Sequence, residues 1–126
     1  MYNGNGESIL IVDDEPLIRQ IVTRILTEAN YNVISADSGK KATELYNENK
    51  DKIALVILDL TMPDLNGRDT FLELQKVNPN IKAIICSGFI NNELVESMGA
   101  LGIYHFVKKP FTIDSYKKIV YNVLNP

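Results

Sequence analysis

The chain has 126 residues, of which 45% are hydrophobic and 23% charged, and its formal net charge is −3 at neutral pH. This length suits one domain with a core of its own, and the slightly acidic balance excludes the basic surface of a protein that binds nucleic acid or an anionic membrane. No apolar run reaches the ~20 residues of a membrane span, so we expect no membrane insertion. Cys86 is the only cysteine, so no intrachain disulfide can form, which favours a reducing, cytoplasmic location.

The first seven residues are polar and rich in Gly and Asn, so we expect a flexible tail or linker over residues 1–7 and a single domain over residues 8–126. Five apolar runs in that domain are short and mostly unbroken, which is typical of strands buried on both faces of a parallel sheet. The predicted strands cover residues 8–12, 31–36, 53–58, 81–86 and 103–107.

Between these runs, apolar residues recur at spacings of three and four, which predicts amphipathic helices. The first helix covers residues 16–29 and has Pro in its first turn, the third follows Gly67, and the fourth covers residues 91–98. Ser38 and Thr112 are predicted to cap the second and fifth helices. Alternation of strands and helices predicts an α/β fold in which a parallel sheet is covered on both faces.

The first strand runs directly into Asp13, Asp14 and Glu15. Adjacent carboxylates in a small volume repel one another unless a cation relieves the repulsion, and an oxygen-only ligand set suits a hard cation such as Mg²⁺. An Asp after a strand also serves as an ordinary cap of the following helix. Taken alone, the acidic pair fits a metal site and a helix cap equally well.

Further polar side chains stand where other predicted strands end, because Asp59, Ser87 and Lys109 follow the third, fourth and fifth strands. The carboxyl ends of parallel strands meet at one edge of the sheet, where ligands of open α/β folds bind. Carboxylates and a backbone carbonyl there would hold Mg²⁺, and a lysine with a hydroxyl would bind a phosphoryl group. Since no Ser or His is placed to act as the nucleophile, Asp59 is the candidate phosphate acceptor, through an acyl phosphate.

These motifs, in their order and spacing, resemble the receiver domain of response regulators in two-component signalling systems, over residues 7–124. The matching motifs are Asp13-Asp14, Asp59 with Met62-Pro63 and Gly67, Ser87-Gly88, and Lys109-Pro110-Phe111. The resemblance implies a doubly wound, five-stranded parallel sheet of strand order 2-1-3-4-5 with five helices, the flavodoxin-like receiver fold.

The resemblance also implies how the site works. Asp59 would take a phosphoryl group from a phosphohistidine of a histidine kinase or phosphotransfer domain. The Mg²⁺ ligands would be Asp13 or Asp14, or both, together with Asp59 and the backbone carbonyl of Thr61. The phosphoryl oxygens would be bound by Ser87 and Lys109.

The switch is implied in the same way. Phe106 occupies the family's aromatic switch position, where tyrosine is frequent, and the Lys109–Pro110 peptide bond is expected to be cis. A downstream protein would dock on the face made by the fourth helix, the fifth strand and the fifth helix. No catalysis is expected beyond self-phosphorylation and slow self-dephosphorylation.

Two other classes of function remain open. A phosphatase of the haloacid dehalogenase type also uses a strand-end aspartate, but it carries a second aspartate two residues later, where this chain has Thr61. A phosphorylation-independent interaction module would have lost an acid or the lysine, and this chain keeps both. The Gly/Asn-rich start fits a receiver at the C-terminus of a hybrid histidine kinase as well as it fits a stand-alone regulator.

Overall fold

The computed structural model describes residues 2–60 and 67–126 and shows a five-stranded parallel sheet of order β2-β1-β3-β4-β5. The predicted fold class and strand order are therefore confirmed. The strands are β1 (Ser8–Val12), β2 (Asn32–Ala36), β3 (Ile53–Asp59), β4 (Ala83–Ser87) and β5 (Phe106–Lys108).

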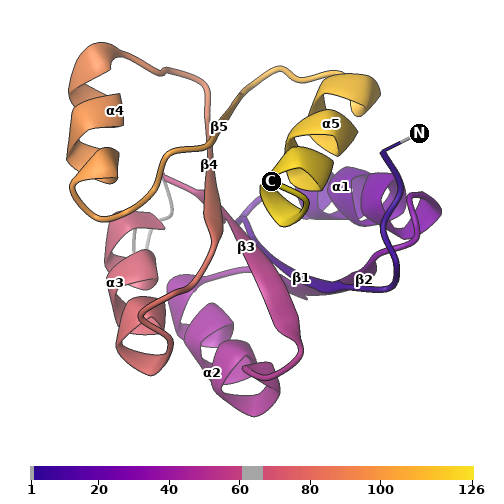
Figure 1. Cartoon of the computed structure of the whole chain (residues 1–126), viewed down its shortest axis with the longest axis horizontal. Coiled ribbons are helices and arrows are strands. Elements are labelled where there is room, and N and C mark those ends of the chain that lie inside the picture. Colours follow the sequence, from indigo (N-terminus) through magenta and orange to yellow (C-terminus); the bar gives the residue numbers. More distant parts are fainter. Residues whose placement is uncertain (1, 61–66) are drawn as a thin grey trace.

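Helices cover both faces of this sheet (Figure 1). They are α1 (Pro16–Glu28), α2 (Gly39–Asn49), α3 (Gly67–Val77), α4 (Asn92–Gly99) and α5 (Ile113–Leu124). The core on one face is shared with α1 and α5, and the core on the other face with α2, α3 and α4. In β1, Ile9 and Ile11 face the first core while Leu10 and Val12 face the second, which explains why the strand is apolar without a break.

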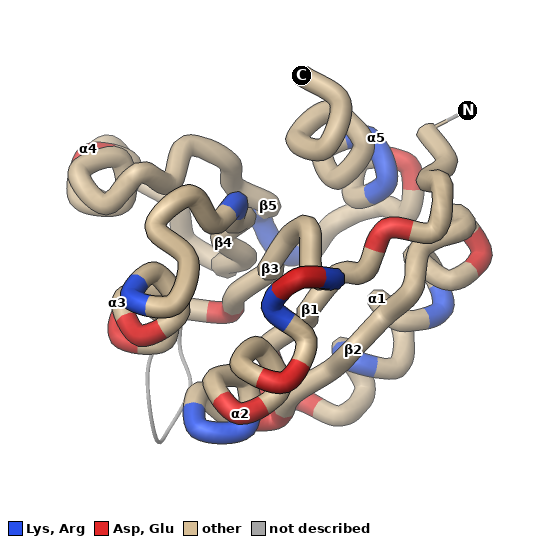
Figure 2. Tube along the Cα trace, turned by 60° about the horizontal axis from the view of Figure 1, so that its bottom comes forward, with Lys and Arg blue, Asp and Glu red and all other residues tan. Residues whose placement is uncertain are grey.

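Charged residues are mixed along the helices (Figure 2). Each helix carries at least one Asp or Glu, so no helix in the described ranges is basic throughout. Among the residues that the structure describes, no helix has the length and apolar character needed to cross a bilayer.

Local sequence signals explain the helix starts. Ser38 Oγ accepts a hydrogen bond from the backbone N–H of Lys41 at 3.1 Å, which confirms the predicted cap of α2. Thr112 and Ser115 form a reciprocal capping box at the start of α5, with both hydrogen bonds at 3.1 Å. Asn91 lies outside α4 as its N-cap, because its side chain accepts from the N–H of Leu94 at 2.8 Å.

Three strands, β2, β4 and β5, begin later than predicted, and β3, β4 and β5 each end one residue later; the difference is largest at the start of β5. Ile103 is 1% exposed, but its N–H donates to Met98 O at 3.0 Å, so it belongs to the turn that closes α4. The turn passes through Gly102 at φ +96°, a conformation that favours glycine. Apolar residues before β4 and β2 likewise lie in turns, since the N–H of Ile81 bonds to Asn78 O and the N–H of Tyr31 to Leu26 O. An apolar run indicates that residues are buried, but it does not distinguish a buried turn from a strand.

The N-terminal segment also differs from the expected flexible tail. The N–H of Gly4 donates to Ala29 O at 2.7 Å, and the N–H of Gly6 donates to Asn30 O at 2.8 Å. Gly4 is buried. Residues 2–7 therefore lie against the domain, beside the turn that joins α1 to β2.

Candidate functional site

Three predicted site residues meet at the carboxyl ends of the strands. Asp13 follows β1 and is 3% exposed, and Asp59 ends β3 and is 5% exposed. Lys109 follows β5, and its Nζ lies 3.2 Å from Asp13 Oδ2 and 3.6 Å from Asp59 Oδ2. Residues that are distant in sequence are thus joined in one buried ionic cluster.

Asp14 completes an acidic group with Asp13 and Asp59. One carboxylate oxygen of each lies within 4.8 Å of the other two, and Asp14 is half-buried while the others are buried. Three carboxylates facing one lysine leave an excess of negative charge in a small, poorly solvated volume. An oxygen-only donor set with open access at Asp14 suits a hard cation that keeps part of its water shell, and Mg²⁺ fits this description.

Backbone contacts hold Asp13 in this position. Its Oδ1 accepts from the N–H of Glu15 at 2.9 Å, and its carbonyl accepts from Arg19 Nη1 at 2.8 Å. The N-cap residue of α1 is Glu15, whose side chain makes no capping hydrogen bond. Neither Asp13 nor Asp14 is therefore the N-cap of α1, and the helix-cap alternative is wrong. Asp13 instead fixes the loop before the helix and leaves Oδ2 facing Lys109. Sequence analysis missed Arg19, because an arginine in the first turns of a helix carries no distinctive signal.

Lys109 is charged in this setting. Burial alone would lower the pKa of Lys109, but the negative charges of Asp13 and Asp59 outweigh burial and raise it. The neighbouring Lys108 is exposed, because successive residues at a strand end point to opposite sides. The Lys109–Pro110 peptide bond is cis.

Gly67 explains how α3 begins so close to the site. A Cβ at Gly67 would lie 2.4 Å from the backbone oxygen of Asp59, so a larger residue would push α3 away from the end of β3. Thr61, whose carbonyl is a predicted Mg²⁺ ligand, lies outside the described residues, as do Met62 and Pro63.

Ser87 reaches the same edge but has its hydroxyl engaged elsewhere. Ser87 Oγ donates to Phe89 O at 2.9 Å and accepts from the N–H of Phe89 at 3.2 Å. The Ser87 carbonyl accepts from the N–H of Lys109 at 2.8 Å, which ties the end of β4 to the chain after β5. The hydroxyl thus closes its own loop while the backbone positions Lys109.

Cys86 lies beside the ionic cluster, whereas Phe106 belongs to the opposite face of the sheet. Phe106 is half-buried on β5 and packs against the core shared with α3 and α4. A depression of about 320 Å³ between β5 and α5 is lined by Phe106, Lys108 and Ser115, among others. Burial raises the pKa of the Cys86 thiol to about 12, more than the positive charge of Lys109 lowers it, so the thiol is neutral at physiological pH.

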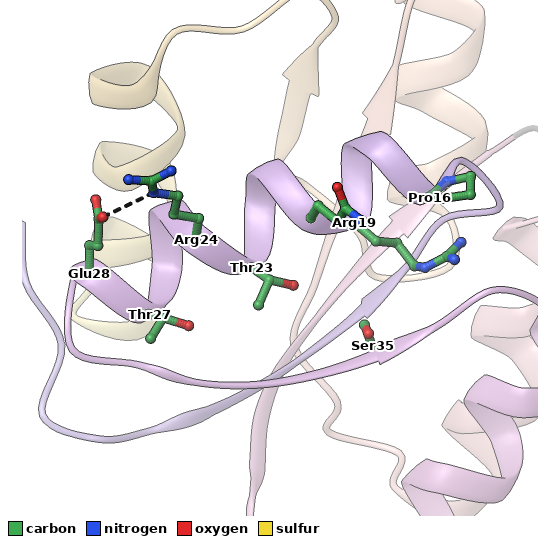
Figure 3. A pocket seen from close by; sticks show the side chains of 8 residues that line it. Pro16, Arg19, Thr23, Arg24, Thr27, Glu28 and Ser35 are labelled. Atoms are coloured by element: carbon green, nitrogen blue, oxygen red, sulfur yellow. Dashed lines mark hydrogen bonds and ion pairs between the residues drawn. The ribbon is translucent and has the colours of Figure 1, made fainter.

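A larger depression, of about 580 Å³, lies between α1 and β2 (Figure 3). Thr23 and Ser35 point toward it, but its two arginines are already engaged: Arg19 donates to the Asp13 carbonyl and Arg24 pairs with Glu28 at 3.2 Å. None of the three acids of the acidic group, Asp13, Asp14 and Asp59, lines this depression. The candidate site at the ends of the strands is therefore separate from this depression.

The family model of the response regulator receiver domain matches residues 9–121. The chain belongs to this family. It is 39% identical to the chemotaxis protein CheY of Thermotoga maritima over 107 residues, which covers 84% of this chain and 88% of that protein. It is 31% identical over 117 residues to the sensor kinase CckA of Brucella abortus, covering 93% of this chain but only 12% of the kinase.

Solved structures agree with this assignment. A chain of the CheX–CheY–BeF3–Mg²⁺ complex from Borrelia burgdorferi superposes with a TM-score of 0.89 at 28% identity, over 94% of this receiver and 90% of that chain. The receiver domain protein of Clostridium thermocellum superposes with a TM-score of 0.86 at 29% identity, over 94% of each chain. The protein is thus a receiver domain of a two-component system, homologous to CheY.

Proposed function

We propose that Asp59 accepts a phosphoryl group from a phosphohistidine of a histidine kinase or phosphotransfer domain. The observation that carries this proposal is the meeting of Lys109 with Asp13 and Asp59 at 3.2 and 3.6 Å, inside an acidic group whose oxygens lie within 4.8 Å of one another. Asp14 belongs to that group, and Asp13, Asp14, Asp59 and the Thr61 carbonyl would hold Mg²⁺. The metal, when bound, offsets negative charge on the phosphoryl oxygens.

The transfer uses groups that the chain already positions. An Asp59 carboxylate oxygen forms a bond to phosphorus, the P–N bond to the donor imidazole breaks, and the imidazole keeps that electron pair and takes up a proton. The acyl phosphate adds about one to two negative charges at neutral pH. Lys109 faces Asp59 and can follow the new oxygens, while the buried Asp13 stays held by the N–H of Glu15.

The switch follows from an exchange of hydrogen bonds at Ser87. Its hydroxyl must give up the hydrogen bond that it donates to Phe89 O in order to donate to a phosphoryl oxygen, and the loop after β4 then moves inward. Phe106 is half-buried and has surface left to bury beside that loop. The affected face, made of α4, β5 and α5, carries the exposed side chains of Val95 and Tyr104 and is where a downstream protein would dock.

The wider setting is proposed on the same grounds. We expect a cytoplasmic protein without nucleic-acid binding, and no catalysis beyond its own phosphorylation and slow dephosphorylation. The similarity to CheY supports a stand-alone regulator, whereas the similarity to CckA supports a receiver joined to a hybrid histidine kinase. The position two residues after Asp59 is Thr61, which lacks the acid that a haloacid dehalogenase phosphatase uses there.

Intact-mass spectrometry after incubation with acetyl phosphate tests the proposal. We expect one added phosphate with Mg²⁺, none with a chelator, and peptide mapping to Asp59. A protein that stays unmodified would indicate an interaction module, and steady turnover of p-nitrophenyl phosphate would indicate a phosphatase.

A further inference from the structure

The segment before β1 is bound to the domain by paired hydrogen bonds. Beyond the two backbone bonds from Gly4 and Gly6, the Asn30 side chain donates to Gly4 O and the Asn32 side chain donates to Gly6 O, each at 2.8 Å. The N–H of Asn32 donates to Glu7 O at 2.9 Å. The segment therefore extends β1 toward the N-terminus and runs beside the residues that precede β2. The side chains of Asn30 and Asn32 bond to its carbonyl groups.

A close fit against Tyr31 fixes the register of this segment. Tyr31 is 3% exposed and belongs to the core shared with α1 and α5. A Cβ at Gly4 would lie 2.1 Å from Cε1 of the Tyr31 ring, and the buried ring has no room to retreat. Only glycine allows the backbone to lie this close to the ring.

The far end of the segment reaches α5. The ring of Tyr2 meets the ring of Tyr121 edge to face, with centroids 5.6 Å apart and an interplanar angle of 63°. Figure 1 shows the N-terminal segment passing α1 on the side of the molecule where α5 lies. The match to the family model begins at residue 9, so residues 2–7 lie outside it.

We infer that residues 2–7, which we call the N-terminal strap, are a built-in brace that ties the α1–β2 turn to the last turn of α5. The strap contacts the end of α5 through Tyr2 and the body of the domain through Gly4, Asn30 and Asn32. It holds the C-terminal end of α5 in place, so that any displacement of this helix is confined to the end near β5. Since α5 belongs to the proposed output face, this last consequence rests on the proposed function.

Amide hydrogen exchange of the unphosphorylated protein tests the brace without reference to phosphorylation. In Gly4→Ala, we expect the amides of residues 29–32 and of the last turn of α5 to exchange at least about tenfold faster, while β3 and β4 are unchanged. Asn3→Ala is the matched control, because Asn3 is exposed within the same segment, and it should leave both regions protected. Faster exchange at residues 29–32 without any change in α5 would overturn the inference.

A second variant separates the two contacts and covers the case in which Gly4→Ala unfolds. Tyr2→Ala removes the ring contact and keeps the hydrogen bonds of Gly4 and Gly6, so α5 alone should lose protection. Unchanged protection of α5 in Tyr2→Ala would show that Tyr121 is not held by the strap.

NMR with Mg²⁺ and beryllofluoride tests whether the strap limits the response of α5. The shift changes on α5 should extend to Tyr121 in Tyr2→Ala but stop short of it in the unsubstituted protein. Identical shift patterns in the two proteins would show that the strap does not limit the response.

Discussion

At the carboxyl ends of the strands, one oxygen from each of three carboxylates lies within 4.8 Å of the others, and two of these acids pair with Lys109. At the opposite end, the strap bonds its backbone groups to partners and packs one aromatic ring against another. The first region holds repulsion that a cation and a phosphoryl group can change. The second has Glu7 as its one acidic side chain and is held by short-range contacts that no ligand is needed to complete. On the proposed function and the proposed brace, one end of the domain responds to phosphorylation and the other stays fixed.

The largest effect should come from the acceptor itself. Asp59→Asn should abolish phosphorylation by acetyl phosphate, because the amide cannot form the acyl phosphate. Removing one of three crowded charges relieves repulsion, so the free energy of unfolding should stay level or rise. Mass spectrometry and urea unfolding measure the two results. Full labelling of the variant would refute the assignment of Asp59, and a marked loss of stability would refute the repulsion that distinguishes the two ends.

Mg²⁺ bound at the acidic group should stabilise the folded protein by mass action. At a concentration about ten times its dissociation constant, a ligand specific for the folded state adds about 1.4 kcal/mol to the free energy of unfolding. Thermal unfolding with and without millimolar Mg²⁺ should therefore show a rise of a few degrees in Tm. Asp14→Ala should weaken this rise, while Glu15→Ala serves as the control because Glu15 is exposed and outside the acidic group. A Tm that is indifferent to Mg²⁺ would contradict a metal site.

The two adjacent lysines provide a matched pair at the same end. Lys109→Ala should leave some phosphoryl transfer but uncouple it from the conformational response, because the charge that follows the phosphoryl oxygens is gone. Lys108→Ala should change neither, since this side chain is exposed and strand alternation places it on the other side from Lys109. Labelling by mass and NMR shifts with beryllofluoride separate transfer from response. Equal effects of both substitutions would contradict the geometry of the ionic cluster.

Ser87→Ala should act on the switch alone. Labelling of Asp59 should persist, but the NMR shift changes around Phe106, Ile90 and Tyr104 that follow phosphorylation should be suppressed. Burying a Phe side chain fully is worth about 1.5–3 kcal/mol, or roughly one to two decades in a two-state population. Unchanged signals at Phe106 in the phosphorylated, unsubstituted protein would rule out this route.

The last effect concerns the core between the two ends and is absent at neutral pH. Burial raises the pKa of Cys86 from its usual 9.0 to about 12, so the unfolded thiol ionises first and stability falls as pH rises above 9.0. The loss should reach about 1.4 kcal/mol near pH ~10. Urea unfolding at neutral and alkaline pH should show this loss in the unsubstituted protein and a smaller loss in Cys86→Ala. An equal loss in both proteins would contradict a protected thiol.

The sequence by itself determined the features that depend on neighbouring residues. Alternating strand and helix patterns gave the α/β class, and the caps at Ser38 and Thr112 were readable because a cap acts within three residues. The acids and the lysine at the strand ends were readable because parallel strands bring their carboxyl ends together. Lys108 and Lys109 could be assigned to opposite sides from strand alternation alone.

Tertiary structure alone decided what depends on distant partners. Apolar patterning could not place the start of β5, because Ile103 is buried in a turn and burial does not require a strand partner. The pairing of the Ser87 hydroxyl with Phe89 could not be read from the sequence. A hydroxyl at a strand end can bond within its own loop as well as to a bound phosphoryl group. The Gly/Asn-rich start reads as flexible because its partners, the side chains of Asn30 and Asn32, lie 26 residues away from the carbonyls they bind. Composition describes what a segment can bond with, and only the fold brings those partners within reach.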